Sequence, residues 1–236
     1  MNSKKDPVTS EDDCCQECGK TADCFQALLP EEQTFLDSRK THLTYLRGET
    51  IFKQGAFAPY ILYMVSGLAR IYLQADRTRQ VNIRIVAAGD FMAFSSIFGE
   101  NVYNCSAVAI KDATVCMIDK TALKQLFMQN ASFAMRILNR NCSGENRYLE
   151  LIHNLSAKQM RGKLASALLY LSDPVLLQEE IFQYLSRQDI ADFASITAES
   201  ATRYIREFEK EGILGLNGKD VQILDRNRLE EINRLG

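Results

Sequence analysis

The spacing of hydrophobic and polar positions changes twice along the chain. From Leu43 to about Ile118, short apolar or alternating runs such as ILYMV, LARIYL and VNIRIV are separated by turn residues at Gly48, Gly55, Gly67 and Gly89-Asp90. Regular short runs of this kind are typical of antiparallel strands in a sandwich or barrel. Ahead of them, Pro30 followed by Glu31 and Glu32 predicts the start of a helix, because proline and acidic residues favour the first turn.

The second pattern, over 121–155, is helical. Five apolar or small residues and one glutamate recur there at steps of 3 and 4, the spacing of a coiled-coil seam: Met135, Leu138, Cys142, Glu145, Leu149 and Ile152. We interpret 121–155 as a dimerisation helix, although a helix packed on its own β domain has the same periodicity. Glu145 at the seam would place like charges opposite each other, which suits a regulated dimer, unless its side chain angles outward to solvent.

A new helix start marks a domain boundary. Ser156 and Gln159 have the spacing of a capping box, and the helix that follows is expected to run to about Ser172, where Asp173-Pro174 stops it. The sequence therefore separates a carboxy-terminal domain, 156–236, from the region before it.

Two short helices joined by a tight turn are predicted inside that domain. Ser186 with Asp189 caps SRQDIADFA, a turn follows at Ser195-Ile196, and Thr197 caps TAESATRYIREFEKEG, which Gly212 ends. This order is that of a helix-turn-helix.

The segment after Gly212 predicts a β-wing. Asn217-Gly218 lies between two apolar runs in ILGLNGKDVQIL, and this dipeptide favours a type I′ hairpin.

The second helix of the pair has two distinct faces. Ala201, Ile205 and Phe208 recur at i, i+4 and i+7 and form the expected buried stripe. The opposite side carries Glu199, Thr202, Arg203 and Arg206. An ordinary solvated face with one Glu199–Arg203 pair is the simplest interpretation.

The chemistry of that polar face also suits DNA. In the major groove arginine can donate two hydrogen bonds to guanine, glutamate can accept one from cytosine, and base contacts come from the amino-terminal part of the helix. We therefore predict base contacts from Glu199, Thr202 and Arg203. Further polar and basic residues are suited to phosphate oxygens: Ser200, Arg206, Lys210 and Lys219.

These helices resemble those of a known family. SRQDIADFASITAESATRYIREFEKEGIL is similar to the DNA-binding helices of the Crp/Fnr transcription regulators, and GETIFKQGAFAPYILYMVSGLARIY and VAAGDFMAF resemble that family's effector-binding β-roll. The resemblance implies an α+β fold with a β-roll (cyclic-nucleotide-binding-like jelly roll) over 25–120, the dimerisation helix over 121–155 and a winged helix-turn-helix over 156–236, after a cysteine-containing arm, 1–24.

The family resemblance also implies partners and residue roles. It implies a homodimer on a pseudo-palindromic double-stranded DNA site and a partner in RNA polymerase. Glu199 and Arg203 carry over as base-reading residues, and Thr202 occupies a position that tunes half-site preference. Ser195 departs from the family, which often has glycine in this turn, because serine there requires a less favourable backbone conformation.

The expected effector pocket lacks a partner for a cyclic nucleotide. The family's cyclic-nucleotide members use an arginine for the phosphate and a glutamate for the ribose. The stretch GDFMAFSSIFGENVYNCSAVAI contains no arginine, and Phe91 follows Gly89-Asp90 where glutamate chemistry would be needed. A buried phosphodiester without a cation is strongly disfavoured, so the sequence argues against this ligand.

The cysteines offer another sensor. Cys15, Cys18 and Cys24 have the spacing C-x2-C-x5-C, with Cys14 as a neighbour that could replace Cys15. Thiolates bind iron–sulfur clusters, Zn²⁺ or Cu(I). A redox-active C-x-x-C enzyme would need a βαβ setting, which this polar arm does not provide, so no catalytic residue is assigned.

The family's oxygen-sensing Fnr branch has similar cysteine spacing and a fourth ligand in a β-roll strand, the place of Cys116. This resemblance implies a [4Fe–4S] cluster that responds to oxygen, redox state or nitric oxide. Structural zinc, a thiol switch, a site without metal and another β-roll effector stay open, as does a redox or zinc interaction protein that no longer reads DNA. Cys105 and Cys142 are interpreted as small buried apolar residues.

Composition sets the remaining expectations. The 236 residues are 46% hydrophobic and 25% charged, which suits two globular domains. The amino-terminal stretch has no signal-peptide pattern and no run is long enough for a membrane span, so a cytoplasmic protein with reduced thiols is expected. The net charge of −2 means that DNA binding must depend on a local cluster of basic residues.

Overall fold

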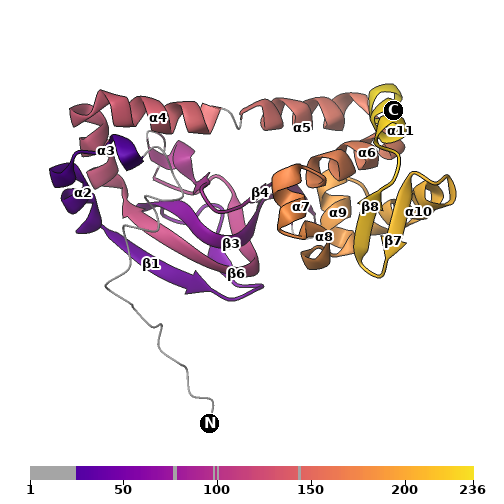
Figure 1. Ribbon diagram of the computed structural model, residues 1–236, viewed down its shortest axis with the longest axis horizontal. Coiled ribbons are helices and arrows are strands. Elements are labelled where there is room, and N and C mark those ends of the chain that lie inside the picture. The colour runs from indigo at the N-terminus through magenta and orange to yellow at the C-terminus, as the bar shows by residue number, and fades with distance from the viewer. Residues whose placement is uncertain (1–24, 77–78, 98, 100, 143–144) are drawn as a thin grey trace, which may run out of the picture. The chain divides into compact units, whose positions relative to one another are not determined.

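The chain divides into two compact units (Figure 1). The computed structural model describes residues 25–76, 79–97, 99, 101–142 and 145–236. The first unit extends to Ile71 and resumes from Ile85 to Glu145, whereas the second joins Tyr72–Arg84 to Asn146–Gly236. The mixed α+β architecture is as expected, but the boundary lies ten residues before the predicted one, since the helix that contains Ser156 belongs with the carboxy-terminal unit from Asn146 onward.

The sheet of the described chain has six strands in the order β1-β6-β3-β4, with β2 paired to β6 and β5 paired to β3. Its strands are β1 (Lys40–Tyr45), β2 (Thr50–Phe52), β3 (Tyr60–Gln74), β4 (Gln80–Val86), β5 (Phe91–Met92) and β6 (Ser106–Asp119). The β1–β6, β2–β6 and β3–β5 pairs are antiparallel, as the sequence predicted.

One predicted turn is part of a strand. Gly67 separates ILYMV from LARIYL in the sequence, yet both runs belong to β3. Its φ is +87°, and a Cβ at this position would lie 2.2 Å from the carbonyl oxygen of Asp112 on β6. Gly67 thus permits a close approach between two backbones rather than a chain reversal.

Helices cover one side of this sheet (Figure 1). They are η1 (Phe25–Ala27), α2 (Pro30–Asp37), α3 (Lys120–Gln129) and α4 (Ala131–Cys142), with η2 (Phe94–Ile97) following β5. Phe25, Tyr63, Phe91 and Phe133 pack together in the buried apolar cluster between helices and strands. The predicted start of α2 at Pro30 is confirmed.

The predicted single helix over 121–155 is wrong in one respect, because three helices occupy it. Asn130 leaves helical geometry at φ −124° and ends α3. Its Oδ1 accepts a hydrogen bond from Phe133 N at 2.9 Å, which caps α4. The third helix is α5 (Glu145–Ala157). A side-chain cap between two helices leaves the spacing of apolar residues intact, so periodicity did not indicate the break.

The second unit contains α5 and the remaining helices and strands: α6 (Met160–Leu171), α7 (Pro174–Gln178), α8 (Ile181–Tyr184), α9 (Arg187–Ala194), α10 (Ala198–Lys210), β7 (Leu214–Asn217), β8 (Asp220–Ile223) and α11 (Arg226–Leu235). The capping box predicted at Ser156 is wrong. Ser156 lies within α5 and its hydroxyl donates to the Ile152 carbonyl at 2.9 Å, while Gln159 precedes α6 without a side-chain cap. Asp173 and Pro174 end the segment as predicted and begin α7.

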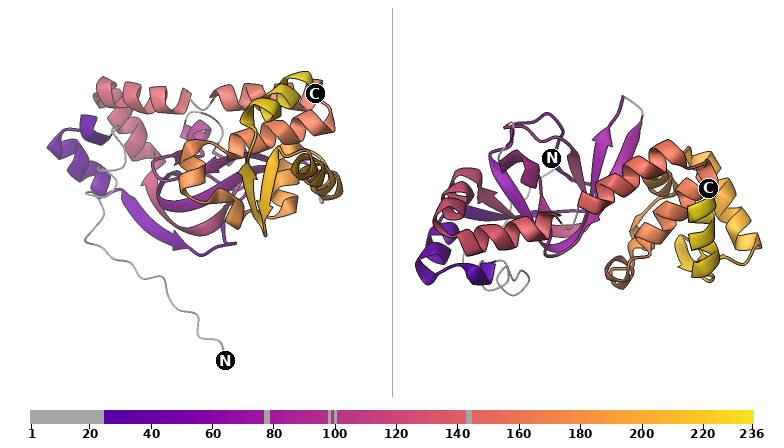
Figure 2. Two further views of the ribbon diagram at one scale, coloured as in Figure 1. Left: turned by 45° about the vertical axis from the view of Figure 1, so that its right-hand side comes forward. Right: turned by 90° about the horizontal axis from the view of Figure 1, so that it is seen from above.

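In this unit α6 contacts α9, α10 and α11, and α10 also contacts β7 (Figure 2). The arrangement places the β7–β8 hairpin beside the second helix of the α9–α10 pair. Over the described residues, every helix is too short or too polar to cross a bilayer.

Candidate nucleic-acid interface

The α9–α10 pair begins and turns where the sequence predicts. Ser186 and Asp189 form the capping box of α9, with 2.6 Å between the two side chains. Thr197 Oγ1 accepts from Ser200 N at 3.2 Å and caps α10. Ser195, the turn residue between them, has φ 52° and therefore adopts the left-handed conformation that serine disfavours.

Helix α10 separates a buried side from a polar side. Ala201, Ile205 and Phe208 are at most 1% exposed, which confirms the predicted stripe. The polar side borders a shallow hollow of about 560 Å³ whose lining comes entirely from α10: Ala198, Glu199, Thr202, Arg203, Arg206, Glu207 and Lys210. Five of the predicted DNA contacts, Lys210 among them, thus share one surface.

The ion pairing on this surface differs from the expected one. Arg203 lies 3.9 Å from Glu207 rather than beside Glu199, and its side chain is 59% exposed. Glu207 also approaches Arg161 of α6, at 3.8 Å. The sequence interpretation did not select Glu207, although its i, i+4 spacing from Arg203 is a usable signal. Glu199 makes no hydrogen bond or ion pair within the described chain.

Two hydroxyls of the surface bond to the backbone or to the cap. Thr202 Oγ1 donates to the Ala198 carbonyl at 2.8 Å, and Ser200 Oγ accepts from Thr197 at 3.0 Å. Both oxygens keep acceptor capacity.

The basic groups of the surface are open to solvent. Arg206, Lys210 and Lys219 are exposed and, among residues with assigned positions, have no acidic partner. Cations that form no ion pair with the described residues can bind anions without first breaking one.

The back of α10 is fixed by ion pairs. Both Glu211 oxygens lie 2.7 Å from Arg161 of α6, and Glu211 is 3.7 Å from Arg228 of α11.

Burial lowers the pKa of Arg187 at the start of α9, an effect that Glu209 opposes.

The wing forms, but its turn is shifted by one residue. Asn217 pairs with Asp220, so the two loop residues are Gly218 and Lys219 rather than Asn217 and Gly218. Gly218 has φ 63°, whereas Lys219 is not in the positive-φ region. Positive φ at the first loop position alone is the pattern of a type II′ turn. Lys219 is exposed at the tip.

The seam residues of the helices before this domain are exposed apolar groups. On α4, Met135 is 54% and Leu138 37% exposed, and on α5 Leu149 is 66% and Ile152 62% exposed. Cys142 at the end of α4 is exposed as well. The side chain of Glu145 lies outside the described part of the structure.

The predicted metal ligands are only partly visible. Cys15, Cys18 and Cys24 lie outside the described residues. Cys116, on β6, is 1% exposed and belongs to the same buried apolar cluster as Phe25, the residue that follows Cys24. No group of three metal-binding side chains occurs within the described ranges. The prediction that Cys105 and Cys142 are buried is wrong, because Cys105 is half-buried and Cys142 exposed.

The stretch that begins at Gly89, where the family's cyclic-nucleotide members bind their ligand, contributes an aromatic side chain to the core. Phe91 is 3% exposed, and its ring centroid lies 5.1 Å from that of Tyr63. The carboxylate of Asp90 accepts from Ala87 N at 3.2 Å and lies 4.0 Å from Arg140. Phe91 is thus committed to the core and presents no polar group.

Two family models match the chain. A cyclic nucleotide-binding domain matches residues 42–130, and a Crp-like helix-turn-helix domain matches residues 162–232.

The relatives that this chain matches are transcriptional regulators. The Fumarate and nitrate reduction regulatory protein of Vibrio cholerae is 27% identical, over 92% of this chain and 89% of its own. The CRP-like cAMP-activated global transcriptional regulator of Mycobacterium tuberculosis is 25% identical, over 88% of this chain and 95% of its own. The solved structure of FixK2 from Bradyrhizobium japonicum has a TM-score of 0.67 at 20% identity and covers 82% of this chain and 97% of its own, a likeness of fold.

Proposed function

The chain belongs to the Crp/Fnr family of transcription regulators, and from this premise we propose that it binds a pseudo-palindromic DNA site as a homodimer. The observation that carries the proposal is the polar side of α10. It is open, it holds Glu199, Thr202 and Arg203 in the first two turns, and the buried stripe on its other side fixes its orientation.

The chemistry assigns a role to each group. Arg203 donates to guanine O6 and N7, Glu199 accepts from cytosine N4, and Thr202 tunes the half-site. The phosphate contacts come from groups that lie around this centre: Ser200, Arg206, Lys210 and Lys219. Arg203 reaches a base by leaving Glu207, which at 3.9 Å is a weak and exposed partner.

The exposed apolar residues of α4 and α5 support the homodimer. Met135, Leu138, Leu149 and Ile152, together with Cys142, keep the spacing of a coiled-coil seam, and a second copy of the same helices would cover them. Glu145 belongs to the same repeat. Two copies related by a twofold axis would place their α10 helices in successive major grooves, about 34–36 Å apart. RNA polymerase is the further partner that we propose, as transcription regulation requires.

For the signal, we propose a [4Fe–4S] cluster held by Cys15, Cys18, Cys24 and Cys116. The fit rests on Cys116, which is buried in the same apolar cluster as Phe25. A thiolate in such an apolar cluster needs a metal or another cation to stabilise it. When bound, the cluster supplies sensitivity to oxygen and nitric oxide. Cys116 would join the segment that precedes Phe25 to the sheet of the first unit.

The metal content of the anaerobically purified protein tests this part. Iron and acid-labile sulfide in equal amounts, lost on exposure to air together with a fall in dimer mass and operator affinity, are the expected results. Cys116→Ser should abolish the iron, whereas Cys105→Ser should keep it. Stoichiometric zinc would favour a structural zinc site instead, and an iron-free protein that binds its operator equally well with and without air would rule the cluster out.

A further inference from the structure

The β3–β4 hairpin is part of the unit that contains the helix-turn-helix. β3 (Tyr60–Gln74) begins in the first unit and β4 (Gln80–Val86) ends in it, but the part between, Tyr72–Arg84, is grouped with Asn146–Gly236. Two consecutive residues of β4, Asn82 and Ile83, make polar contacts with helices of the second unit. The hairpin is therefore continuous with the strands of the sheet and makes hydrogen bonds to helices α5 and α9 of the second unit.

Asn82 contacts the first helix of the pair directly. Its Nδ2 donates to the main-chain oxygen of Asp189 in the first turn of α9, at 2.9 Å, and its side chain is fully buried. The Asp189 carboxylate meanwhile accepts from Ser186 in the capping box. A buried amide is tolerated only when it is hydrogen-bonded, so this contact specifies one docked position of the hairpin on α9.

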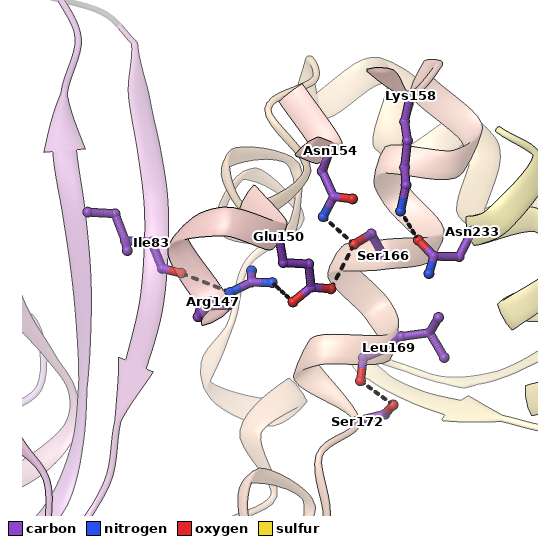
Figure 3. A network of polar contacts seen from close by, with 9 residues as sticks. All are labelled: Ile83, Arg147, Glu150, Asn154, Lys158, Ser166, Leu169, Ser172 and Asn233. Carbon is purple, nitrogen blue, oxygen red and sulfur yellow. Dashed lines mark hydrogen bonds and ion pairs between the residues drawn. The ribbon is translucent and has the colours of Figure 1, made fainter. Parts of the chain in front are cut away.

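Arg147 of α5 holds the next residue of the hairpin (Figure 3). Its Nε donates to the Ile83 carbonyl at 3.3 Å, and its Nη1 lies 3.1 Å from Glu150. The guanidinium also stacks 3.7 Å above the ring of Tyr170, and its side chain is only 10% exposed. One arginine thus satisfies three partners in a fixed geometry.

The contacts of Arg147 continue into both neighbouring helices. Tyr170 of α6 packs against Phe193 of α9 with ring centroids 5.8 Å apart. Glu150 accepts from Ser166 of α6 at 3.5 Å, and Asn154 donates to the same hydroxyl at 2.5 Å (Figure 3). The hairpin, α5, α6 and α9 are therefore joined by one connected set of contacts.

These contacts leave the reading surface open. The hollow along α10 is lined by residues 198–210 alone, and none comes from the hairpin. The docked hairpin can therefore fix α9 without covering the side chains that would contact bases.

We propose that Asn82 and Arg147 are positioning residues for DNA binding. They hold the hairpin against α9, and α9 sets the angle of α10 through their shared interface. This inference rests on the DNA-reading function proposed above. No sequence signal could have indicated it, since Asn82 and Asp189 are 107 positions apart.

The test compares Asn82→Ala with Gln80→Ala in the full-length protein. Gln80 is a matched control on the same hairpin, because its Nε2 donates within the hairpin, to Gln74 at 3.1 Å. Asn82→Ala should lower the affinity for the selected operator about five- to thirtyfold, and Gln80→Ala less than about twofold. Hydrogen exchange of the α9 amides should accelerate only in Asn82→Ala, while the strands of the first unit keep their protection.

Each outcome decides the question. Unchanged or higher affinity in Asn82→Ala, or unchanged α9 exchange, overturns the inference. If Asn82→Ala unfolds the unit, Arg147→Lys replaces it, because lysine keeps the charge but loses the fork and the stacking. For Arg147→Lys, a reduced affinity for the operator at an unchanged melting temperature supports the inference. An unchanged operator affinity overturns it. A wild-type protein that binds no duplex would refute the proposed function instead, and the exchange measurement would still show whether the hairpin holds α9.

Discussion

Arg203 and Lys210 share one face of α10, yet their chemistry predicts different effects on DNA binding. Arg203→Ala should cost about 1–3 kcal/mol in each half-site and relax the preference at one base pair of each, because a bidentate contact to guanine disappears. Lys210→Ala should weaken all duplexes about equally, because a phosphate contact carries no sequence information. Competition binding against a set of single-base operator variants measures both.

Lys210→Ala serves as the matched control in that experiment, since it removes a cation from the same helix. An Arg203→Ala protein that kept the wild-type preference at every base pair would contradict the base-contact assignment.

Ser195 predicts a gain in stability. It combines a positive φ of 52° with a buried hydroxyl that has no hydrogen-bond partner in the structure as described. Ser195→Gly should raise the free energy of unfolding of the second unit by about 1 kcal/mol, since glycine adopts this conformation without strain. Calorimetry of the full chain measures the change.

Ser195→Ala is the control for the turn, because it removes the hydroxyl and keeps the strained backbone. It should stabilise less than glycine does. Equal melting temperatures for the wild-type protein and Ser195→Gly would show that the turn stores no strain.

At the residue level, the sequence predicts what backbone chemistry dictates. The caps at Ser186 and Thr197 and the stripe through Ile205 follow from local rules and are confirmed. Side-chain partners do not follow, because they depend on which neighbour a flexible side chain reaches. Arg203 has acidic residues at both i−4 and i+4, and the structure places it near Glu207.

Among the secondary-structure elements, periodicity located the helical region but not its segments. Asn130 ends one helix and caps the next without disturbing the seam. The same limit applies at Gly67, where a glycine that resembles a turn in the sequence lies inside β3. Gly67 acts through a contact with Asp112 on a distant strand, and Asn130 also donates to the Ala27 carbonyl at 2.9 Å, so neither role follows from apolar periodicity.

Cys142 offers a direct probe of the proposed seam. In a parallel homodimer, a seam residue faces its own copy across the twofold axis, so two Cys142 thiols would lie close together. Copper–phenanthroline, as the oxidant, should join them in a disulfide-linked dimer that reducing agent dissolves. Non-reducing electrophoresis detects it.

Cys142→Ser should abolish that cross-link, whereas Cys105→Ser, which changes the half-buried cysteine, should retain it. A cross-link that persists in Cys142→Ser would place the dimer contact elsewhere.

For the whole molecule, composition gave little indication of the partner. A net charge of −2 conceals three exposed cations around α10 and the wing that form no ion pair with any acidic residue of the described ranges. The fold also does not determine which signal the protein senses, because relatives of similar sequence identity are named for cAMP and for fumarate and nitrate reduction. Three of the four proposed ligands lie outside the described residues, so local packing around Cys116 alone bears on the cluster.

The salt dependence of binding reports on the assembled dimer. Each phosphate contact contributes about 0.9 to the slope of log K against log salt. Because a homodimer carries every substitution twice, Lys219→Ala should reduce that slope by about 2 rather than about 1. Titrations at several salt concentrations measure it. An unchanged slope would remove the wing tip from the interface.

Selection of binding sites from random duplexes tests the central claim most directly, because it requires both the reading surface of α10 and the twofold symmetry of the protein. The account predicts an enriched inverted repeat whose half-sites are centred about 10–10.5 base pairs apart. Recovery of no common sequence, or of one unpaired half-site, would contradict it.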